Sequence, residues 1–492
     1  MASNSTDLLL RVNQWLASPP LATPQEELDA LRPHLAALAN HALSAGQMQS
    51  VLEGLHARSY VAIESLLPKL HSVRLPVSPQ TRLTVRAMQE VLEHLIRLSL
   101  DQVEHPDAHL IKGLGTPTEN TLWRIFIALD RQITIADLTA SSHLPGVWQN
   151  LHRAYLAARR HHVELKTPKG APYPLQALYA RILMLGALPA SALSAQEWSI
   201  VHLYLLRTSA RIELTDTAPD ERQETVLWVA PESDSPPLHL LRRAPSDDTL
   251  ALYVQYGALL AEVDQLARSL SDGSGRIALP PEIPPRLAAI ALKHLLDYLA
   301  APKKRRYPRR RQGYRATLCF GLSDITALYT PEDSPLKRTP ELSEWMVVNE
   351  SPGGYAAMHV AGRPAKVQVG DLIALRRNDE SHWPICVVRW ALSDNPEHLE
   401  LGLQEISPEA RLGFLTTTGE QSDSRPTALL LPPVPPIRTQ AAIAFDPAHR
   451  PALNKKHVLT VSGENNLFRE FTLATEIEAS ATTEVRLIND CV

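Results

Sequence analysis

The sequence changes character at Lys303-Lys304-Arg305-Arg306-Tyr307-Pro308-Arg309-Arg310-Arg311-Gln312-Gly313-Tyr314-Arg315, a run with eight positive charges in thirteen residues. The whole chain of 492 residues has a formal net charge of −4, so this basic run lies in an otherwise acidic protein. A local concentration of positive charge favours the binding of an anion. A solvated linker can have the same composition, so the sequence on either side of the run has to decide between the two interpretations.

Short segments of alternating polarity follow the basic run. They are Ala316–Phe320, Trp345–Val348, Tyr355–Met358, Asp371–Arg376, Pro384–Trp390 and Leu399–Gln404. Short strands of this kind, separated by Gly or Pro turns, predict a closed antiparallel β-barrel of six strands. A short helix is expected between the first two strands, at Asp324–Tyr329.

The hexapeptide Asn349-Glu350-Ser351-Pro352-Gly353-Gly354 follows the second predicted strand. Together with the arginines before the barrel, it resembles the signature of the PilZ domain, a six-stranded barrel that binds the bacterial second messenger cyclic di-GMP. That signature has R-x-x-x-R just before the barrel and [D/N]-x-S-x-x-G at the start of a strand. The second part is matched by Asn349, Ser351 and Gly354. The resemblance covers residues 303–408 and does not extend to the first 300 residues.

The arginine part of the signature is matched in more than one register. The two principal matches are Arg305 with Arg309, and Arg306 with Arg310. The interval between the two parts of the signature is longer than the family usually has. An insertion is therefore expected between the first two strands of the barrel.

The resemblance implies a cyclic di-GMP site made of Arg305, Arg306, Arg309, Arg310, Asn349, Ser351 and Gly354. The chemistry of these residue types agrees, because an arginine fork can bind a phosphate or the O6/N7 edge of guanine. Asn and Ser offer donors and acceptors for a guanine edge, and Gly permits a close backbone approach. Taken alone, Asn349 and Ser351 also fit a tight turn in which their side chains bond the backbone. Tyr307 is either a stacking surface for a base or an ordinary packed side chain.

The region before the basic run is predicted to be mainly α-helical. Thr23-Pro24-Gln25-Glu26 has the pattern of a capping box with proline at the first helical position. Further helices are expected at Met48–Leu70, Arg82–Val103, Thr118–Arg131, Trp148–Arg160, Pro174–Leu188, Ala195–Thr208, Leu250–Leu270 and Pro285–Ala300. Strand-like segments between residues 211 and 250 predict a small β-structure inside this helical region.

We therefore expect an α+β protein with several domains. Residues 1–300 are predicted to form a mostly helical region with a small β excursion, residues 301–410 a PilZ-like barrel preceded by the arginine-rich linker, and residues 411–492 a small C-terminal β-rich extension. Strands are expected in this extension at Ala428–Leu431, His457–Val461 and Phe468–Leu473.

Several classes of protein are disfavoured. The cysteines Cys319, Cys386 and Cys491 are widely spaced and form no CxxC pair, so neither a disulfide framework nor a structural zinc site is expected. No apolar run reaches the roughly 18 residues of a membrane-spanning helix, and the first residues lack the basic stretch of a secretory signal. No catalytic signature is found. We expect a cytoplasmic protein without enzymatic activity, cofactor or metal.

The predicted function is that of a bacterial cyclic di-GMP effector. Cyclic di-GMP would neutralise the repelling charges of residues 303–311, order the linker against Asn349 and Ser351, and fix the barrel relative to the helical region, which would signal to a protein partner. The resemblance implies control of motility, pili, biofilm or exopolysaccharide. One alternative is a PilZ-like adaptor that binds no nucleotide and acts through protein contacts. Another is a nucleic-acid-binding protein, which is disfavoured because the positive charge is confined to one linker.

Overall fold

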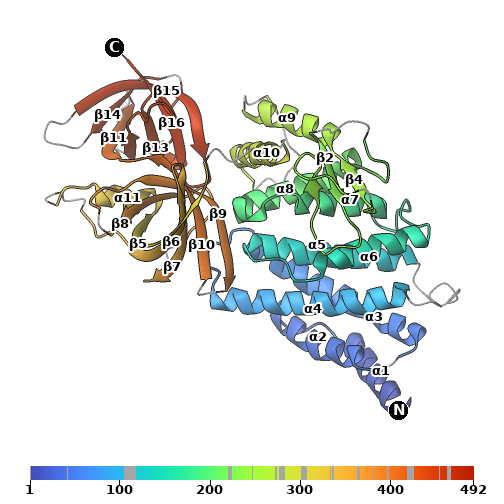
Figure 1. The fold of residues 1–492 in the computed structure, drawn as a ribbon. Coiled ribbons are helices and arrows are strands. Elements are labelled where there is room, and N and C mark those ends of the chain that lie inside the picture. Colours follow the sequence, from blue (N-terminus) through green and yellow to red (C-terminus); the bar gives the residue numbers. More distant parts are fainter. Residues whose placement is uncertain are drawn as a thin grey trace. The chain divides into compact units, whose positions relative to one another are not determined.

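A computed structural model describes residues 2–41, 43–104, 118–219, 224–246, 248–271, 274–275, 283–300, 307–332, 334, 337–362, 366–378, 380–395, 398–417, 426–453, 455–461 and 467–491. The chain divides into two compact units (Figure 1). The first unit comprises residues 1–73, 77–190 and 195–303, and the second comprises residues 74–76, 191–194 and 304–492. No helix in the described ranges is long and apolar enough to cross a membrane.

The first unit is mainly helical, which confirms the prediction for this part of the chain. Its α-helices are α1 (Ala2–Ala17), α2 (Pro24–Ala39), α3 (Ala45–Leu66), α4 (Pro79–Glu104), α5 (Thr118–Leu138), α6 (Val147–Arg160), α7 (Leu175–Gly186), α8 (Ala195–Thr208), α9 (Gly257–Ser271) and α10 (Pro285–Leu299). Short 3-10 turns follow α3 and α8, at η1 (Leu67–Leu70) and η3 (Ser209–Arg211), and η2 (Ala190–Ala192) precedes α8.

Local sequence explains where the second helix begins. The Thr23 hydroxyl accepts a hydrogen bond from the Glu26 backbone N–H at 3.2 Å, and the Glu26 carboxylate accepts one from the Thr23 backbone N–H at 3.0 Å. This reciprocal pair is the predicted capping box, with Pro24 at the first helical position. The helix then buries its leucines against its neighbours, because a helix of this length is not stable alone in water.

A four-stranded antiparallel sheet interrupts the helices, as predicted for the region after residue 211. Its strands are β1 (Glu213–Thr215), β2 (Val226–Val229), β3 (Leu238–His239) and β4 (Leu252–Gln255), in the order β1-β4-β2-β3. The helix predicted at Leu250–Leu270 was wrong in its first part. Leu252–Gln255 is a largely buried inner strand, and the helix begins only at Gly257. A short apolar run is compatible with a helix or with a buried strand. Here the run forms a strand because it pairs with β1 on one side and β2 on the other.

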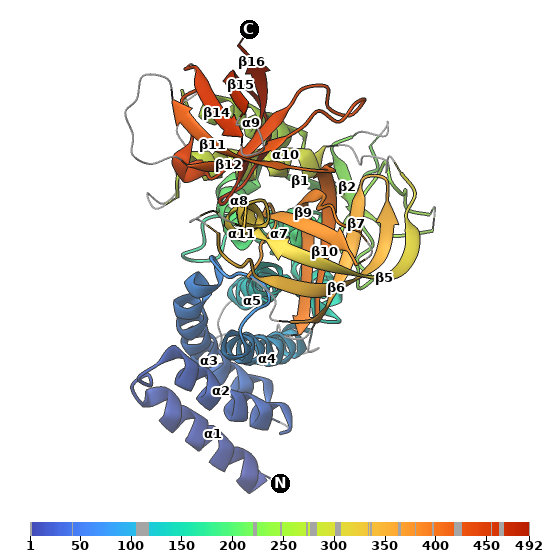
Figure 2. The ribbon, with the colours of Figure 1, turned by 90° about the vertical axis from the view of Figure 1, so that its left-hand side faces the viewer.

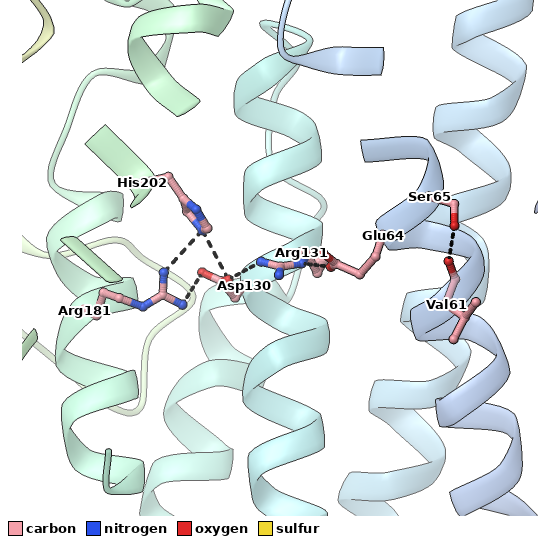
Figure 3. Close-up of polar contacts among 7 residues, drawn as sticks. All are labelled: Val61, Glu64, Ser65, Asp130, Arg131, Arg181 and His202. Atoms are coloured by element: carbon pink, nitrogen blue, oxygen red, sulfur yellow. Dashed lines mark hydrogen bonds and ion pairs between the residues drawn. The ribbon is translucent and has the colours of Figure 1, made fainter. Parts of the chain in front are cut away.

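A network of charged side chains joins four helices of the first unit (Figure 3). Asp130 of α5 is fully buried, and its carboxylate lies 2.9 Å from Nη2 of Arg181 on α7 and 3.3 Å from Nε2 of His202 on α8. Arg131 joins the same carboxylate to Glu64 of α3. Burial alone would raise the pKa of Asp130, but Arg181 and His202 beside it hold that pKa well below its usual range.

The second unit contains two closed β-barrels (Figure 2). The strands of the first are β5 (Arg310–Phe320), β6 (Leu342–Ser351), β7 (Gly354–Ala361), β8 (Leu372–Arg377), β9 (Ile385–Asn395) and β10 (His398–Ser407). A short helix, α11 (Gly321–Leu328), lies in the insertion between β5 and β6. These elements confirm the predicted six-stranded antiparallel barrel and its helical insertion.

The C-terminal β-rich region also closes into a barrel of six strands. They are β11 (Arg411–Thr417), β12 (Thr427–Leu431), β13 (Ala442–Phe445), β14 (His457–Val461), β15 (Leu467–Ala479) and β16 (Glu484–Asp490), with a 3-10 turn η4 (Pro447–His449). Numbered from one to six along the chain, the strands of both barrels follow the same order around the circle, 1-2-3-6-5-4. The second unit is therefore a tandem of two barrels with one topology.

One hydrophobic cluster contains residues of both barrels. The first barrel supplies Leu372, Ala374, Ile385 and Val387, and the C-terminal barrel supplies Leu429, Leu431, Ala442, Ala444 and Val485. A polar contact supports this interface, since the Thr482 hydroxyl lies 2.6 Å from the carboxylate of Asp371. Apolar surface buried between the barrels stabilises both of them, so they are expected to unfold together.

Candidate functional site

A pocket of about 250 Å³ opens on the first barrel beside the β6–β7 hairpin. Among the residues singled out from the sequence, it is lined by Tyr307, Arg309, Asn349, Ser351 and Gly354. The other lining residues are Gly353, Tyr355, Arg389, Trp390, Gly402, Leu403 and Gln404. The pocket is thus built from the segment before β5, the β6–β7 hairpin and the strands β9 and β10.

The spacing of the N-x-S motif follows from strand geometry. Asn349 and Ser351 are two residues apart on β6, so their side chains leave the same face of the strand, toward the pocket. Glu350 between them faces the other way, where it accepts a hydrogen bond from Tyr314 at 3.1 Å and pairs with Arg377. At the end of the hairpin, the Ser351 hydroxyl donates to the carbonyl oxygen of Gly354 at 3.4 Å.

Gly354 fills a position that no other residue fits. Its φ of +149° is one that L side chains rarely adopt, and a Cβ atom added there would lie 1.9 Å from the carbonyl oxygen of Leu403. The backbone of β7 therefore passes directly against β10 at the floor of the pocket. Close backbone approach is the reason for this glycine.

The structure describes two of the four arginines predicted as ligands, and it places them differently. Arg309 lines the pocket, whereas Arg310 is the first residue of β5, is exposed, and stands opposite Glu350 in the β5–β6 ladder. The other two predicted ligands, Arg305 and Arg306, lie outside the described residues. Among the four arginines, the described geometry favours Arg309 as a residue that faces the pocket.

Sequence reasoning missed Arg389, Trp390 and Gln404. In the β9–β10 ladder Gly402 pairs with Trp390 but Leu403 pairs with Val388, so Arg389 is the extra residue of a β-bulge. A bulge re-aims side chains, and here Arg389 and Trp390 both line the pocket although they are neighbours in the chain. Gly402 makes room for the indole, since a Cβ atom there would lie 1.7 Å from Trp390 Nε1. A glycine inside the predicted strand Leu399–Gln404 was the available signal for such a close approach.

The pocket is electrostatically suited to an anion. Among the described residues that line it, the charged ones are Arg309 and Arg389, both positive. Two carboxylates lie close to this lining: Glu405 accepts a hydrogen bond from the Tyr355 hydroxyl at 2.8 Å, and Glu478 pairs with Arg389. Burial and the neighbouring Glu405 raise the pKa of Tyr355, so this phenol stays neutral and keeps donating to the carboxylate at physiological pH.

Comparisons with known proteins match both units. Residues 327–411 match the family model described as "Cyclic-di-GMP receptor FimW, middle PilZ domain", and residues 11–223 match "Cyclic-di-GMP receptor FimW, N-terminal domain". The Cyclic-di-GMP receptor FimW of Pseudomonas aeruginosa is 35% identical over 115 residues. These residues cover 23% of this chain and 18% of that receptor, so the chain spans less than a fifth of the relative's length in this match.

Proposed function

We propose that this protein, in which residues 327–411 form a PilZ domain, is a receptor that binds cyclic di-GMP in the pocket beside the β6–β7 hairpin. One observation supports this most strongly. Asn349, Ser351 and Gly354, the three matches to the N-x-S-x-x-G signature, line the same pocket as Arg309 from the arginine run. Arg309 and Asn349 are 40 residues apart in the sequence. They nevertheless line one pocket, where the arginine can bind a phosphate and the asparagine can bond the edge of a guanine.

The chemistry of the pocket suits the two parts of the ligand. Cyclic di-GMP carries two phosphates, and each can accept a bidentate contact from an arginine such as Arg309 or Arg389. Its guanines offer donors and acceptors to the side chains of Asn349 and Ser351. The rings of Tyr307 and Trp390 line the pocket and provide aromatic surfaces on which a purine can stack.

Binding is expected to act by ordering the chain before the barrel. Residues 303–311 carry several like charges close together, and two phosphates would neutralise part of this repulsion. We infer that Arg305 or Arg306 then joins Arg309 on the ligand. This segment lies at the start of region 301–410, directly after region 1–300 and well before region 411–492 in the chain. A partner protein that distinguishes the ordered from the unordered state would transmit the signal in the bacterial cytoplasm, to motility, pili, biofilm or exopolysaccharide control.

The test is isothermal titration of cyclic di-GMP into the full chain and into Arg309→Ala, Ser351→Ala and Arg310→Ala. We expect saturable binding to the wild type, no response to cyclic di-AMP, and at least about tenfold weaker binding in the first two variants. Arg310→Ala is the matched control, because Arg310 lies next to Arg309 in the run but does not line the pocket. Its affinity is expected to change by less than about threefold.

Two results would contradict the proposal. A folded wild-type protein that gives no heat with cyclic di-GMP would indicate an adaptor barrel without a nucleotide ligand. An affinity for cyclic di-GMP that falls in Arg310→Ala but not in Arg309→Ala would also contradict it. The ligand would then be bound by the arginine pair Arg306 and Arg310, and not by the arginine that lines the pocket.

A further inference from the structure

Arg389 in the pocket wall is held by a residue from the C-terminal barrel. Its Nε atom donates to the side-chain oxygen of Gln404 at 2.7 Å, and its Nη1 atom donates to one carboxylate oxygen of Glu478 at 2.7 Å. Its Nη2 atom bonds the other oxygen of the same carboxylate. Glu478 belongs to β15 of the C-terminal barrel, whereas Arg389 and Gln404 belong to β9 and β10 of the first.

Irregular strand pairing on both sides brings the two side chains together. Arg389 is the extra residue of the β9–β10 bulge. On the other side, the β15–β16 ladder shifts register between Glu476 and Glu478, so β15 is also bulged there. Bulges re-aim side chains at functional positions. Two bulged strands thus direct a guanidinium and a carboxylate toward one another across the interface of the barrels.

The geometry leaves Arg389 able to serve a ligand. An arginine has five N–H groups, and Gln404 and Glu478 occupy three of them. The remaining two belong to a guanidinium that lines the pocket and is fixed in orientation by a bidentate contact. A side chain fixed in this way loses less freedom when a ligand binds than a mobile one does.

We propose that Glu478 is a positioning residue of the nucleotide pocket, and that the C-terminal barrel therefore completes the site of the first barrel. This inference rests on the proposed function, since it assigns Arg389 to a phosphate or a guanine edge of cyclic di-GMP. Arg389 contacts the ligand, and Glu478 acts through Arg389. The C-terminal barrel is then part of the receptor site and not an independent module.

The test compares cyclic di-GMP affinities of Glu478→Gln, Arg389→Ala and the double variant, all in the full chain. Gln keeps the size of Glu478 but removes the charge that fixes the guanidinium. We expect about tenfold weaker binding in each single variant and no further loss in the double variant, because both changes remove the same contact.

The matched control is Glu476→Gln. Glu476 lies two residues away on the same strand, but its carboxylate binds Nη2 of Arg486 at 3.0 Å within the C-terminal barrel. This variant is expected to bind cyclic di-GMP as the wild type does, which separates the role of Glu478 from any general weakening of the C-terminal barrel.

The outcomes separate this inference from the proposed function. Wild-type affinity in Glu478→Gln, tighter binding in that variant, or additive losses in the double variant would overturn the inference while leaving the receptor intact. Failure of the wild type itself to bind cyclic di-GMP would overturn the proposed function and this inference together.

Discussion

Gly354→Ala is expected to abolish cyclic di-GMP binding and to destabilise the barrel by about 3 kcal/mol or more. The added Cβ atom would lie 1.9 Å from the carbonyl oxygen of Leu403, a backbone atom that cannot rotate away. The φ of +149° adds strain of its own. The clash can be relieved only if β7 and β10 move apart. Such a movement would distort the pocket, because Ser351 and Gln404 line it beside Gly354.

The measurements are a thermal melt followed by circular dichroism and a titration with cyclic di-GMP. A loss of about 3 kcal/mol in a unit of this size lowers the melting temperature by roughly 10 °C. Gly313→Ala is the matched control, because Gly313 lies on β5 of the same barrel and a Cβ atom there meets nothing within 4 Å. A variant at Gly354 that melts and binds as the Gly313 variant does would show that the hairpin tolerates a side chain.

Asp130→Asn is expected to destabilise the helical unit by about 3–5 kcal/mol, the usual effect of breaking a buried ion pair from one side. The substitution keeps the size of the side chain but leaves the guanidinium of Arg181, which is fully buried, without its counter-ion. It also weakens the links to His202 and Arg131 that connect α5 with α8 and α3. Figure 3 shows Asp130 between these partners.

The control for this prediction is Asp264→Asn. Asp264 pairs with Arg268 one turn along α9, where the two side chains are 40% and 75% exposed, so a change below about 0.5 kcal/mol is expected. Chemical denaturation of both variants gives the comparison. Equal stabilities would show that the Asp130 network does not hold the helices together.

The same network predicts a pH dependence. Because the pKa of Asp130 is depressed in the folded protein, its contribution to stability is present above about pH 4, the ordinary value for a carboxyl group. That contribution is lost as the pH falls from there toward the folded-state pKa. The difference in the free energy of unfolding between the wild type and Asp130→Asn should therefore shrink in acid.

Local patterns in the sequence were sufficient for much of the fold and for one side of the site. The capping box at Thr23, the apolar stripes of the helices and the alternation of the first barrel are short-range signals, and the structure follows them. The placement of Asn349, Ser351 and Gly354 also depends on neighbours in the chain, since a hairpin is a local structure.

The other wall of the pocket depends on pairing between distant segments. Arg389 faces the pocket because a bulge opposite β10 turns it, and its partner Glu478 comes from a strand 89 residues later. No periodicity within β9 predicts such a contact. The closure of the C-terminal barrel was missed for a similar reason, because β13 (Ala442–Phe445) has only four residues and is recognised by its pairing with β12 and β16.

The most direct test of the account is a crystal structure of the protein with cyclic di-GMP. We expect the nucleotide in the pocket beside the β6–β7 hairpin, with a guanine edge within hydrogen-bonding distance of Asn349 or Ser351 and a phosphate on Arg309. A nucleotide bound elsewhere on the chain, or bound without contact to these residues, would contradict the central claim.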